Sequence, residues 1–436
     1  MVRFSVGLKR LAGKSLSEKW AERYSPKAFL EDKERIRYRL IEDVPVMVGI
    51  DGSIVCIPHR HEPNNIAVVG KKGTGKSLLL NRISGEIFYL WGEGVVLMND
   101  VQGECFSWNE GMKNEEWISQ LGIINEIPLA IPIIYIFPNT NTLNLDYTKL
   151  SSEINFISIT IPFSEVIDKS EVYLKLGGSS RYVQGLKDDL LGCEIPQDVY
   201  DLIEEKCSGS KRELMKEKIL VSFDNVFEEG ILNITNKEYP YYLQCGNLKG
   251  NPFVVFLKIG VVPCFETSDL FTKRYMPEVF AYHLDSIFQS KFRGGLLHGE
   301  PVYIFFDELT HICSTENHNS AFDSVNMISA RGRKLDIGIC YATQNYSKIP
   351  QITKSNTDFL FAFQHSNEKE VNEIKKDFDL QALNKKEIMN LKDFEVLGIT
   401  KEYFVCYKGG DRWEESGPIK GVIIPPQSNH TPPSRI

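Results

Sequence analysis

Short apolar runs alternate with longer amphipathic stretches along most of the chain, and this alternation predicts its fold. Apolar runs that are too short for helices and are bounded by glycine, proline or polar residues indicate buried strands. Helices are expected from residue 76 onward and over residues 276–289. Strands that alternate with helices predict an α/β fold, in which a mainly parallel sheet has helices on both faces. The expected strands span residues 65–70, 94–100, 132–137, 252–258, 302–307, 335–342 and 359–363.

Two regions depart from this alternation near the start of the chain. Residues 1–44 are rich in basic side chains, which favours either an arm that contacts nucleic acid or a neighbouring subunit, or a solvated helical extension. After Val44, two short apolar runs flank the pair Asp51-Gly52. An Asp-Gly pair between apolar runs is typical of a tight turn, so these runs predict two short paired strands.

A third departure lies in the middle of the chain, where the pattern becomes helical and charged. Candidate helices span residues 181–191, 196–206 and 211–227. The last 12 residues contain four prolines and are expected to form a tail over the surface or at a subunit interface. The predicted organisation is a basic N-terminal extension (1–44), the first part of the core (45–148), a mostly helical insertion (149–250), the second part of the core (251–424) and a C-terminal tail (425–436).

Composition narrows the classes of protein that fit. The net charge of −8 excludes a wholly basic nucleic-acid coat, but it allows a local basic strip that lines a pore. The nine cysteines include no C-x-x-C pair, which disfavours a zinc ribbon or a thioredoxin-type site. No run approaches the roughly 18–20 apolar residues that a membrane span requires. The sequence therefore predicts a cytoplasmic protein without a transmembrane segment, at most peripheral to a membrane.

A glycine-rich loop at residues 70–77 follows the first core strand and leads into the helix at Lys76. Its sequence, GKKGTGKS, matches the pattern G-x-x-x-x-G-K-[ST] completely. The backbone N–H groups of such a loop face one anion, and the helix N-terminus adds its dipole. Lys76 is expected to reach the β- and γ-phosphates of ATP, and Ser77 to bind Mg²⁺. The predicted nucleotide-binding residues are Gly70, Lys72, Gly73, Thr74, Gly75, Lys76, Ser77 and Leu78.

Two acidic residues, Asp307 and Glu308, end the most apolar strand of the chain. We expect Asp307 to hold Mg²⁺ through its water shell, together with Ser77. Glu308 is expected to orient and deprotonate the attacking water, which points to hydrolysis of ATP and not merely to its binding. The alternative is an ordinary strand end with two solvated acids.

Polar residues around a later strand complete the candidate site. Gln344 follows the strand at residues 335–342 and is our candidate sensor of the γ-phosphate, although a glutamine after a strand is commonly a simple loop residue. Arg331 and Arg333 precede that strand. A guanidinium group stabilises the charge on a transferring phosphoryl group, and in ring ATPases it often comes from the neighbouring subunit. A basic, solvated turn is the alternative for either arginine.

Taken together, these segments resemble the HerA/FtsK superfamily of DNA-pumping ATPases, and most closely its HerA-like branch and the coupling ATPases of type IV secretion. Residues 100–104 (DVQGE), 306–308 (FDE) and 331–344, which end in Thr-Gln, resemble the motifs of this branch. Residues 356–358 and 391–398 resemble its closing segments. The likeness covers residues 44–424, with the helical insertion matched only in position. HerA carries a β-barrel ahead of its core, whereas only 44 residues precede the core here.

The resemblance implies a RecA-like core and a hexameric ring with nucleotide at the subunit interfaces. It also implies a central channel that moves double-stranded DNA, as in a helicase-type translocase, and a protein partner such as a nuclease or a secretion component. One alternative is an ATPase that drives protein transport or assembly in a secretion-type or viral machine. Another is a nucleotide-switched scaffold that hydrolyses slowly. Glu308 argues against the scaffold, because a switch does not need a strong base.

Overall fold

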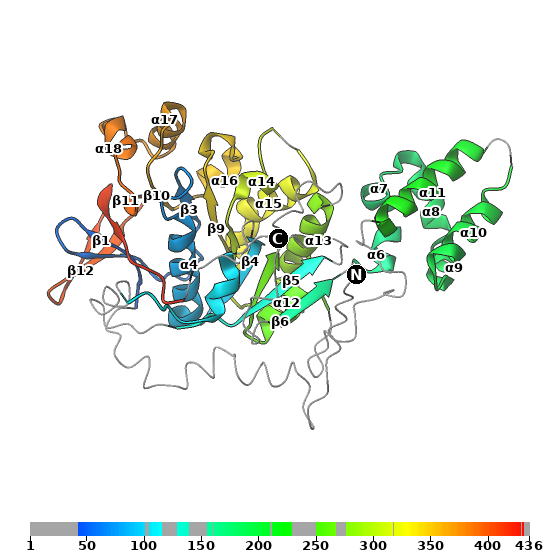
Figure 1. The fold of residues 1–436 in the computed structure, drawn as a ribbon, viewed down its shortest axis with the longest axis horizontal. Coiled ribbons are helices and arrows are strands. Elements are labelled where there is room, and N and C mark those ends of the chain that lie inside the picture. The colour runs from blue at the N-terminus through cyan, green and yellow to red at the C-terminus, as the bar shows by residue number, and fades with distance from the viewer. Residues whose placement is uncertain are drawn as a thin grey trace, which may run out of the picture.

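The computed structural model of the protein describes residues 42–100, 104–115, 129–138, 155–159, 161–209, 212–228, 250–266, 276–316, 318–428 and 430. Within these residues, 14 strands form one continuous sheet in the order β13-β12-β2-β1-β14-β11-β10-β3-β9-β8-β4-β7-β5-β6 (Figure 1). The strands are β1 (Val44–Gly49), β2 (Ile54–Ile57), β3 (Ile66–Val69), β4 (Gly94–Asp100), β5 (Ile133–Pro138), β6 (Asn155–Ile159), β7 (Val262–Glu266), β8 (Val302–Phe306), β9 (Ile337–Thr343), β10 (Phe359–Ala362), β11 (Glu395–Thr400), β12 (Phe404–Lys408), β13 (Asp411–Glu415) and β14 (Ile419–Ile423).

The sheet has a parallel half and an antiparallel half, which meet at β10. From β10 to β6 every pair of neighbouring strands is parallel, as the alternation of strands and helices predicts. From β10 to β13 every pair is antiparallel. The predicted hairpin at the start of the core is confirmed, since β1 pairs with β2 around the turn that contains Asp51 and Gly52.

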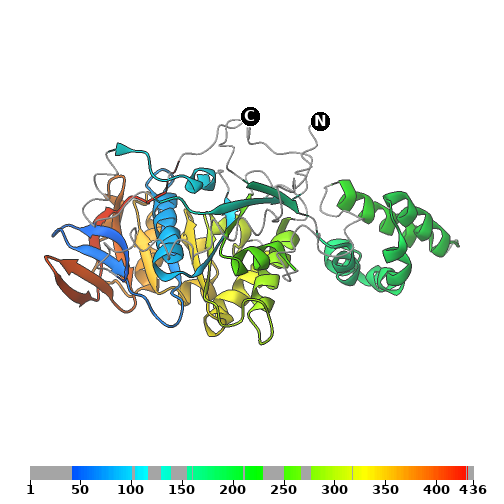
Figure 2. The same cartoon turned by 90° about the horizontal axis from the view of Figure 1, so that it is seen from below.

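Two layers of helices cover the two faces of the parallel half. Alternate residues of a strand face opposite sides, so Ala67 and Val69 of β3 belong to one buried cluster and Ile66 and Val68 to the other. Figures 1 and 2 show the sheet between the two layers. One face is covered mainly by α12 (Pro252–Lys258), α13 (Met276–Ser290) and α15 (Ser320–Arg331), and the other by α4 (Lys76–Glu86) and the π-helical turn η1 (Ile87–Trp91).

Shorter helices complete the core around these two layers. Most of them follow the carboxyl ends of parallel strands or connect one strand to the next. They are η2 (Glu104–Asn109), α14 (Leu309–Ile312), η8 (Gly332–Leu335), η9 (Tyr346–Lys348), α16 (Gln351–Ser355), α17 (Glu368–Asp377) and α18 (Lys385–Met389). The α/β fold class predicted from the sequence is therefore confirmed.

The strand predicted over residues 252–258 is wrong, because this segment forms the helix α12. Pro252 occupies the first turn, and the side chain of Asn251 accepts a hydrogen bond from the N–H of Phe253 at 3.0 Å, which caps the helix. Residues 252–257 are all buried, because α12 packs against β4, β7 and α13. A short helix buried on every side shows no amphipathic period, so its sequence looks like that of a buried strand. The next strand of the sheet, β7, begins after this helix, at Val262.

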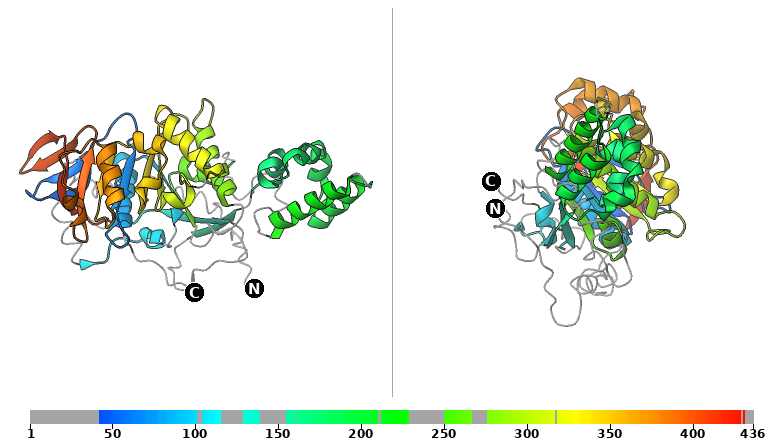
Figure 3. Two further views of the ribbon diagram at one scale, coloured as in Figure 1. Left: turned by 90° about the horizontal axis from the view of Figure 1, so that it is seen from above. Right: turned by 90° about the vertical axis from the view of Figure 1, so that its right-hand side faces the viewer.

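A helical bundle between β6 and α12 forms one end of the molecule. Figures 1 and 3 show it beyond the β6 edge of the sheet. Two of the predicted helices are found nearly as expected, at 196–206 and 213–228, but the one predicted over 181–191 is divided at Leu186. β6 joins the sheet although it lies within the span 149–250, and the division into domains stays a prediction. The helices are α6 (Phe163–Asp168), α7 (Ser170–Tyr173), η5 (Gly177–Ser179), α8 (Ser180–Gly185), α9 (Lys187–Gly192), α10 (Pro196–Lys206) and α11 (Glu213–Glu228).

The chain after β14 packs against α4, and we call its described residues, 424–428 and 430, the C-terminal strap. Residues 424–428 are buried. The predicted tail, over the surface or at a subunit interface, falls largely outside the described residues and stays a prediction. The carbonyl of Gln427 accepts hydrogen bonds from the N–H groups of Met112 and Leu129, both at 2.9 Å. The hydroxyl of Ser428 donates to Oδ1 of Asn81 on α4 at 2.6 Å. These hydrogen bonds explain the burial, because they satisfy the polar groups of the strap in the interior.

Candidate active site

The glycine-rich loop is held between the two strands that flank β3. The N–H of Gly70 donates to the carbonyl of Thr343 at the end of β9 at 3.2 Å, and the N–H of Lys71 donates to the carbonyl of Gln364 after β10 at 2.9 Å. A Cβ at position 70 would lie 2.6 Å from Cβ of Phe363, so only glycine allows this close approach. The loop is therefore fixed at the carboxyl edge of the sheet.

The loop ends at Gly75, where α4 begins. Gly75 has a φ of 108° and is the residue that precedes the helix, and no side chain caps the first turn of α4. The backbone N–H groups of an uncapped first turn are available to an anion, and the dipole of the 11-residue helix favours negative charge there. The loop and the helix together form a site suited to a phosphate chain.

Lys76 lies folded over this loop. Its Nζ donates to the carbonyl of Lys71 at 2.9 Å, and the hydroxyl of Thr74 donates to the same carbonyl at 2.9 Å. Lys76 is only 8% exposed. Burial lowers the pKa of nearby His365 to about 4, and the positive charge of Lys76 acts in the same direction. His365 is therefore neutral at physiological pH and adds no charge beside the ammonium group of Lys76.

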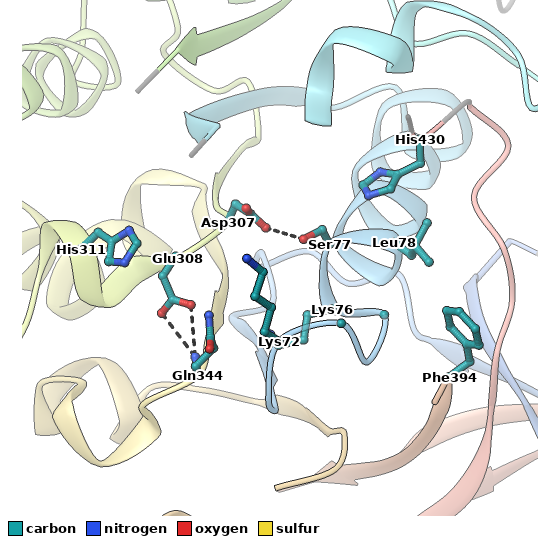
Figure 4. Close-up of a pocket in the computed structure, with 12 residues that line it drawn as sticks. Lys72, Lys76, Ser77, Leu78, Asp307, Glu308, His311, Gln344, Phe394 and His430 are labelled. Atoms are coloured by element: carbon teal, nitrogen blue, oxygen red, sulfur yellow. Dashed lines mark hydrogen bonds between the residues drawn. The ribbon is translucent and has the colours of Figure 1, made fainter. Parts of the chain in front are cut away.

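Ser77 and Asp307 meet across the pocket, as Figure 4 shows. The hydroxyl of Ser77 donates to Oδ1 of Asp307 at 2.8 Å. Mg²⁺ prefers oxygen ligands and is commonly held by one or two protein groups together with water and phosphate oxygens. A hydroxyl and a carboxylate at this separation fit such a site. No cluster of three or more His, Cys, Asp or Glu side chains suited to a metal ion occurs in the described part of the chain.

Glu308 is held by donors from its own strand end and from the end of β9. The hydroxyl groups of Thr310 and Thr343 donate to Oε1 of Glu308 at 2.5 and 2.8 Å. The backbone N–H of Gln344 lies 3.3 Å from Oε1 and 3.2 Å from Oε2. Because Glu308 is only 6% exposed, these hydrogen bonds offset the cost of burying its carboxylate and fix its orientation.

The order of the strands explains why these groups meet. β9 lies between β3, which leads into the loop, and β8, which leads into the two acids. Gln344 follows β9 and lines the pocket with an exposed side chain, and its backbone N–H donates to Glu308. Thr343 was not among the predicted site residues, and its sequence signal was its place as the Thr of the Thr-Gln pair that carries part of the resemblance.

The two candidate arginines lie away from this pocket. Arg333 forms an ion pair with Asp358 and donates to the carbonyl of Asn356 at 3.2 Å. Asp358 also accepts a hydrogen bond from the N–H of Asn65 at 2.8 Å, and Asn65 directly precedes β3. Arg331 ends α15 and is exposed. Both arginines thus belong to the amino edge of the sheet, about 20 Å from the loop at the opposite edge, given the rise of a strand.

The pocket around these groups has a volume of about 310 Å³ and extends past the predicted residue Leu78 to Phe394 and His430, which the sequence did not point to. Figure 4 shows Glu308, Gln344 and His311 on one side of the loop, and Leu78, Phe394 and His430 on the other. Phe394 lies in the segment 391–398 that carries part of the resemblance, but nothing in its sequence marks it as a pocket residue. His430 is brought there by the C-terminal strap. The signature at 100–104 lies largely outside the described residues.

Comparisons with known proteins are consistent with this architecture. No protein-family model matches the chain, and no curated protein matches its sequence. The bacterial conjugative coupling protein TrwB, in complex with the ATP analogue ADPNP, is 15% identical, with a TM-score of 0.51 over 93% of this chain and 94% of TrwB. TrwB in complex with the GTP analogue GDPNP gives 15% identity and a TM-score of 0.50 over 92% and 94%. VirB4 of Thermoanaerobacter pseudethanolicus gives 14% identity and a TM-score of 0.49 over 86% and 96%.

These likenesses concern the fold, since the identities are low. They extend over nearly the whole of TrwB as solved. Among the described residues, no helix combines the length and the apolar character needed to cross a bilayer. The chain has the RecA-like P-loop NTPase fold of the coupling protein TrwB, as its resemblance to the HerA/FtsK superfamily implies.

Proposed function

We propose that this chain hydrolyses ATP with Mg²⁺ in the pocket at the carboxyl edge of its sheet and uses the reaction to translocate double-stranded DNA through a hexameric ring. The observation that carries the hydrolytic part is the placement of Glu308. It is buried, oriented by three neighbouring residues and located beside the Ser77–Asp307 pair. A carboxylate fixed in this way is positioned to act as a general base.

The proposed reaction assigns one task to each group. The loop backbone and Lys76 bind the β- and γ-phosphates, and Lys76 exchanges its hydrogen bond to the Lys71 carbonyl for phosphate oxygens. Ser77 and Asp307 hold Mg²⁺, which when bound neutralises charge on the phosphate oxygens. Glu308 accepts a proton from a water molecule whose oxygen forms a bond to the γ-phosphorus. The bond from that phosphorus to the β–γ bridging oxygen breaks, which yields ADP and phosphate.

The end of β9 gives this site a route for sensing the γ-phosphate. The Gln344 side chain lines the pocket, while its backbone N–H contacts Glu308. If Gln344 changes position when the γ-phosphate leaves, its backbone N–H, which donates a hydrogen bond to Glu308, moves as well. This coupling is the physical basis on which we assign Gln344 as the sensor.

We assign the two arginines to the nucleotide site of a neighbouring subunit in the ring. Arg331 and Arg333 lie at the edge of the sheet opposite their own pocket, so they cannot serve it within one chain. A ring that places the amino edge of one subunit against the carboxyl edge of the next brings an arginine to the nucleotide. In that assembly Arg331 is exposed and available, whereas Arg333 must first leave the ion pair with Asp358.

The solved neighbours support a nucleotide-driven machine without identifying its cargo. TrwB shares the fold, is described as a conjugative coupling protein and has been solved with an ATP analogue. A second candidate function, transport or assembly of proteins, is favoured by the helical bundle. Ile195, Leu214 and Val221 of this bundle are each more than half exposed, which suits a protein partner better than DNA.

Linear double-stranded DNA is expected to raise the steady-state ATPase rate of the wild-type ring several-fold, because a motor couples turnover to its track. The rate is measured with and without DNA on a preparation whose hexameric state has been established by native mass spectrometry. Single-stranded DNA of equal nucleotide concentration is the control. A confirmed ring whose ATPase rate does not respond to DNA counts against the DNA motor and in favour of a protein cargo.

A further inference from the structure

The chain after β9 connects the pocket to helix α17, and we call residues 344–347 the sensor loop. At one end of this loop, the backbone N–H of Gln344 donates to the carboxylate of Glu308, with distances of 3.3 and 3.2 Å to its two oxygens (Figure 4). At the other end, Ser347 donates to Glu370 in the first turn of α17. The sensor loop therefore joins the proposed base to a helix outside the pocket.

One residue, Ser347, occupies both oxygens of the Glu370 carboxylate. The N–H of Ser347 donates to Oε2 and its hydroxyl donates to Oε1, both at 2.7 Å. Glu370 is only 4% exposed, so burial of its charge costs free energy, which these two charge-assisted hydrogen bonds offset. Because two donors of the same residue bind the two oxygens of one carboxylate, the contact fixes both the position and the orientation of Ser347.

The helix that carries Glu370 is anchored on its own account. Asn367 caps α17, and Glu370 lies in the first turn, where the helix dipole favours a negative charge. Buried Lys354 of α16 lies 3.3 Å from the carboxylate of Glu373 and 3.5 Å from that of Asp377, and this pairing ties α17 to its neighbour. Glu370 therefore holds the sensor loop against an element that is fixed independently of the pocket.

Any effect of Glu370 on the reaction has to pass through the sensor loop. Among the described residues, those that line the pocket do not include Glu370. Ser347 and Gln344 are three residues apart, so at most about 11 Å of chain separates them. A shift of Ser347 is therefore transmitted over a short distance to Gln344 and to its hydrogen bond with Glu308.

The charge of Glu370 does not offer a competing route through His365. Burial lowers the pKa of His365 to about 4, and the charge of Glu370 acts in the opposite direction. Removal of that charge lowers the pKa of His365 further, so this imidazole is neutral at physiological pH with or without Glu370. The contact with Ser347 is thus the route by which a neutral substitution at position 370 reaches the site.

We propose that Glu370 is a positioning residue for ATP hydrolysis, which acts by holding Ser347 and, through it, the hydrogen bond from Gln344 to Glu308. This inference rests on the proposed function, since it assumes that Glu308 is the general base. A base has to keep its orientation toward the attacking water, so a loosened sensor loop slows the chemical step. The phosphate-binding loop is unaffected, so the affinity for ATP is retained.

Glu370→Gln tests this proposal, because it keeps the size of the side chain and replaces one acceptor oxygen by an NH₂ group that can only donate. We expect kcat to fall roughly 10- to 100-fold, the range found when outer groups that orient functional ligands are removed. The affinity for Mg·ATP by calorimetry is expected to stay at the wild-type value. Glu368→Gln is the matched control, since Glu368 is an exposed acid in the same turn and pairs with Lys385. We expect it to leave both quantities unchanged.

Ser347 provides a second variant at the other side of the same contact. Ser347→Ala removes the hydroxyl donor and is expected to lower kcat several-fold, whereas Ser347→Thr keeps the hydroxyl and is expected to stay close to the wild type. The double variant Ser347→Ala/Glu370→Gln is expected to be about as slow as Glu370→Gln, because both changes break one contact. Losses that multiply in the double variant contradict a shared contact.

The Glu308→Gln background separates positioning from a general structural role. In single-turnover measurements on this background, Glu370→Gln is expected to cause no further loss, because the base that the loop orients is already absent. A further loss of about 10-fold there overturns the inference, as does a Glu370→Gln variant with unchanged kcat or with weakened Mg·ATP binding. In each of these cases the hydrolytic site stands. If the wild-type protein hydrolyses no ATP, the proposed function fails and this inference with it.

Discussion

Glu308→Gln is expected to lower the steady-state ATPase rate by about 10²–10⁴-fold, the range that a positioned general base contributes. The amide cannot accept a proton from water at neutral pH. Its carbonyl oxygen can take the place of Oε1, which accepts from Thr310 and Thr343, so the fold is expected to be retained. Phosphate release measures the rate, and calorimetry with Mg·ATP is expected to show affinity close to that of the wild type.

Glu316→Gln is the matched control, because Glu316 is an exposed acid on the same segment and forms an ion pair with Lys348. This control is expected to hydrolyse ATP at the wild-type rate. A Glu308→Gln variant with undiminished turnover excludes Glu308 as the base. Equally negligible turnover in the wild type and the variant favours a nucleotide-switched scaffold over a motor.

Lys76→Ala is expected to abolish measurable turnover, with a loss in kcat/KM of at least about 10²–10³-fold, as for the removal of one preorganised charge-stabilising group. Unlike Glu308→Gln, it is also expected to weaken Mg·ATP binding, because the ammonium group contacts the phosphates in both the ground state and the transition state. Alanine is a good helix former, so α4 is expected to persist. Hydrolysis rate, calorimetry and the thermal midpoint of unfolding are measured together.

Lys385→Ala serves as the control for Lys76→Ala, because Lys385 begins α18 and pairs with Glu368 away from the pocket. Its rate and affinity are expected to match the wild type. Retention of wild-type turnover in Lys76→Ala would remove the loop from the active site. A lowered unfolding midpoint in that variant would indicate that the loss comes from a damaged fold.

The central strands and the loop could be predicted because their signals are local. The apolar run before Gly70, the complete loop motif and the helix that begins at Lys76 follow one another directly, and each has a short-range physical cause. The acids after β8 could be placed near the loop because the carboxyl ends of parallel strands share one edge. In contrast, the helix at residues 252–258 was predicted as a strand, because complete burial removes the hydrophobic periodicity that distinguishes a helix from a strand.

The parts of the site that could not be predicted depend on contacts between distant segments. Strand order places Thr343 beside Glu308, and no pattern within β9 specifies its neighbours. Phe394 lies in the pocket because of a turn after α18 in which its φ is positive. His430 lies there because the strap contacts Asn81 and Trp108, which are more than 300 residues earlier in the chain. The antiparallel half beyond β10 was predicted only at its first hairpin, because short, partly exposed strands such as β13 carry weak alternation.

The arginines illustrate a limit of another kind. Their spacing from Gln344 fits the resemblance, yet Arg333 is paired with Asp358 at the far edge of the sheet. A site that a second subunit completes cannot be predicted from the sequence of one chain, because the contact between the arginine and the nucleotide forms only in the assembled ring. The assignment of Arg331 and Arg333 therefore stays a prediction.

The central claim, that hydrolysis at this pocket moves double-stranded DNA, is tested most directly by displacement of a triplex-forming strand from linear DNA. The wild-type protein with Mg·ATP is expected to release the third strand. The same protein with a non-hydrolysable ATP analogue, and Glu308→Gln with ATP, are expected to leave it bound. A wild-type ring that hydrolyses ATP in the presence of this DNA and never releases the third strand would contradict the account.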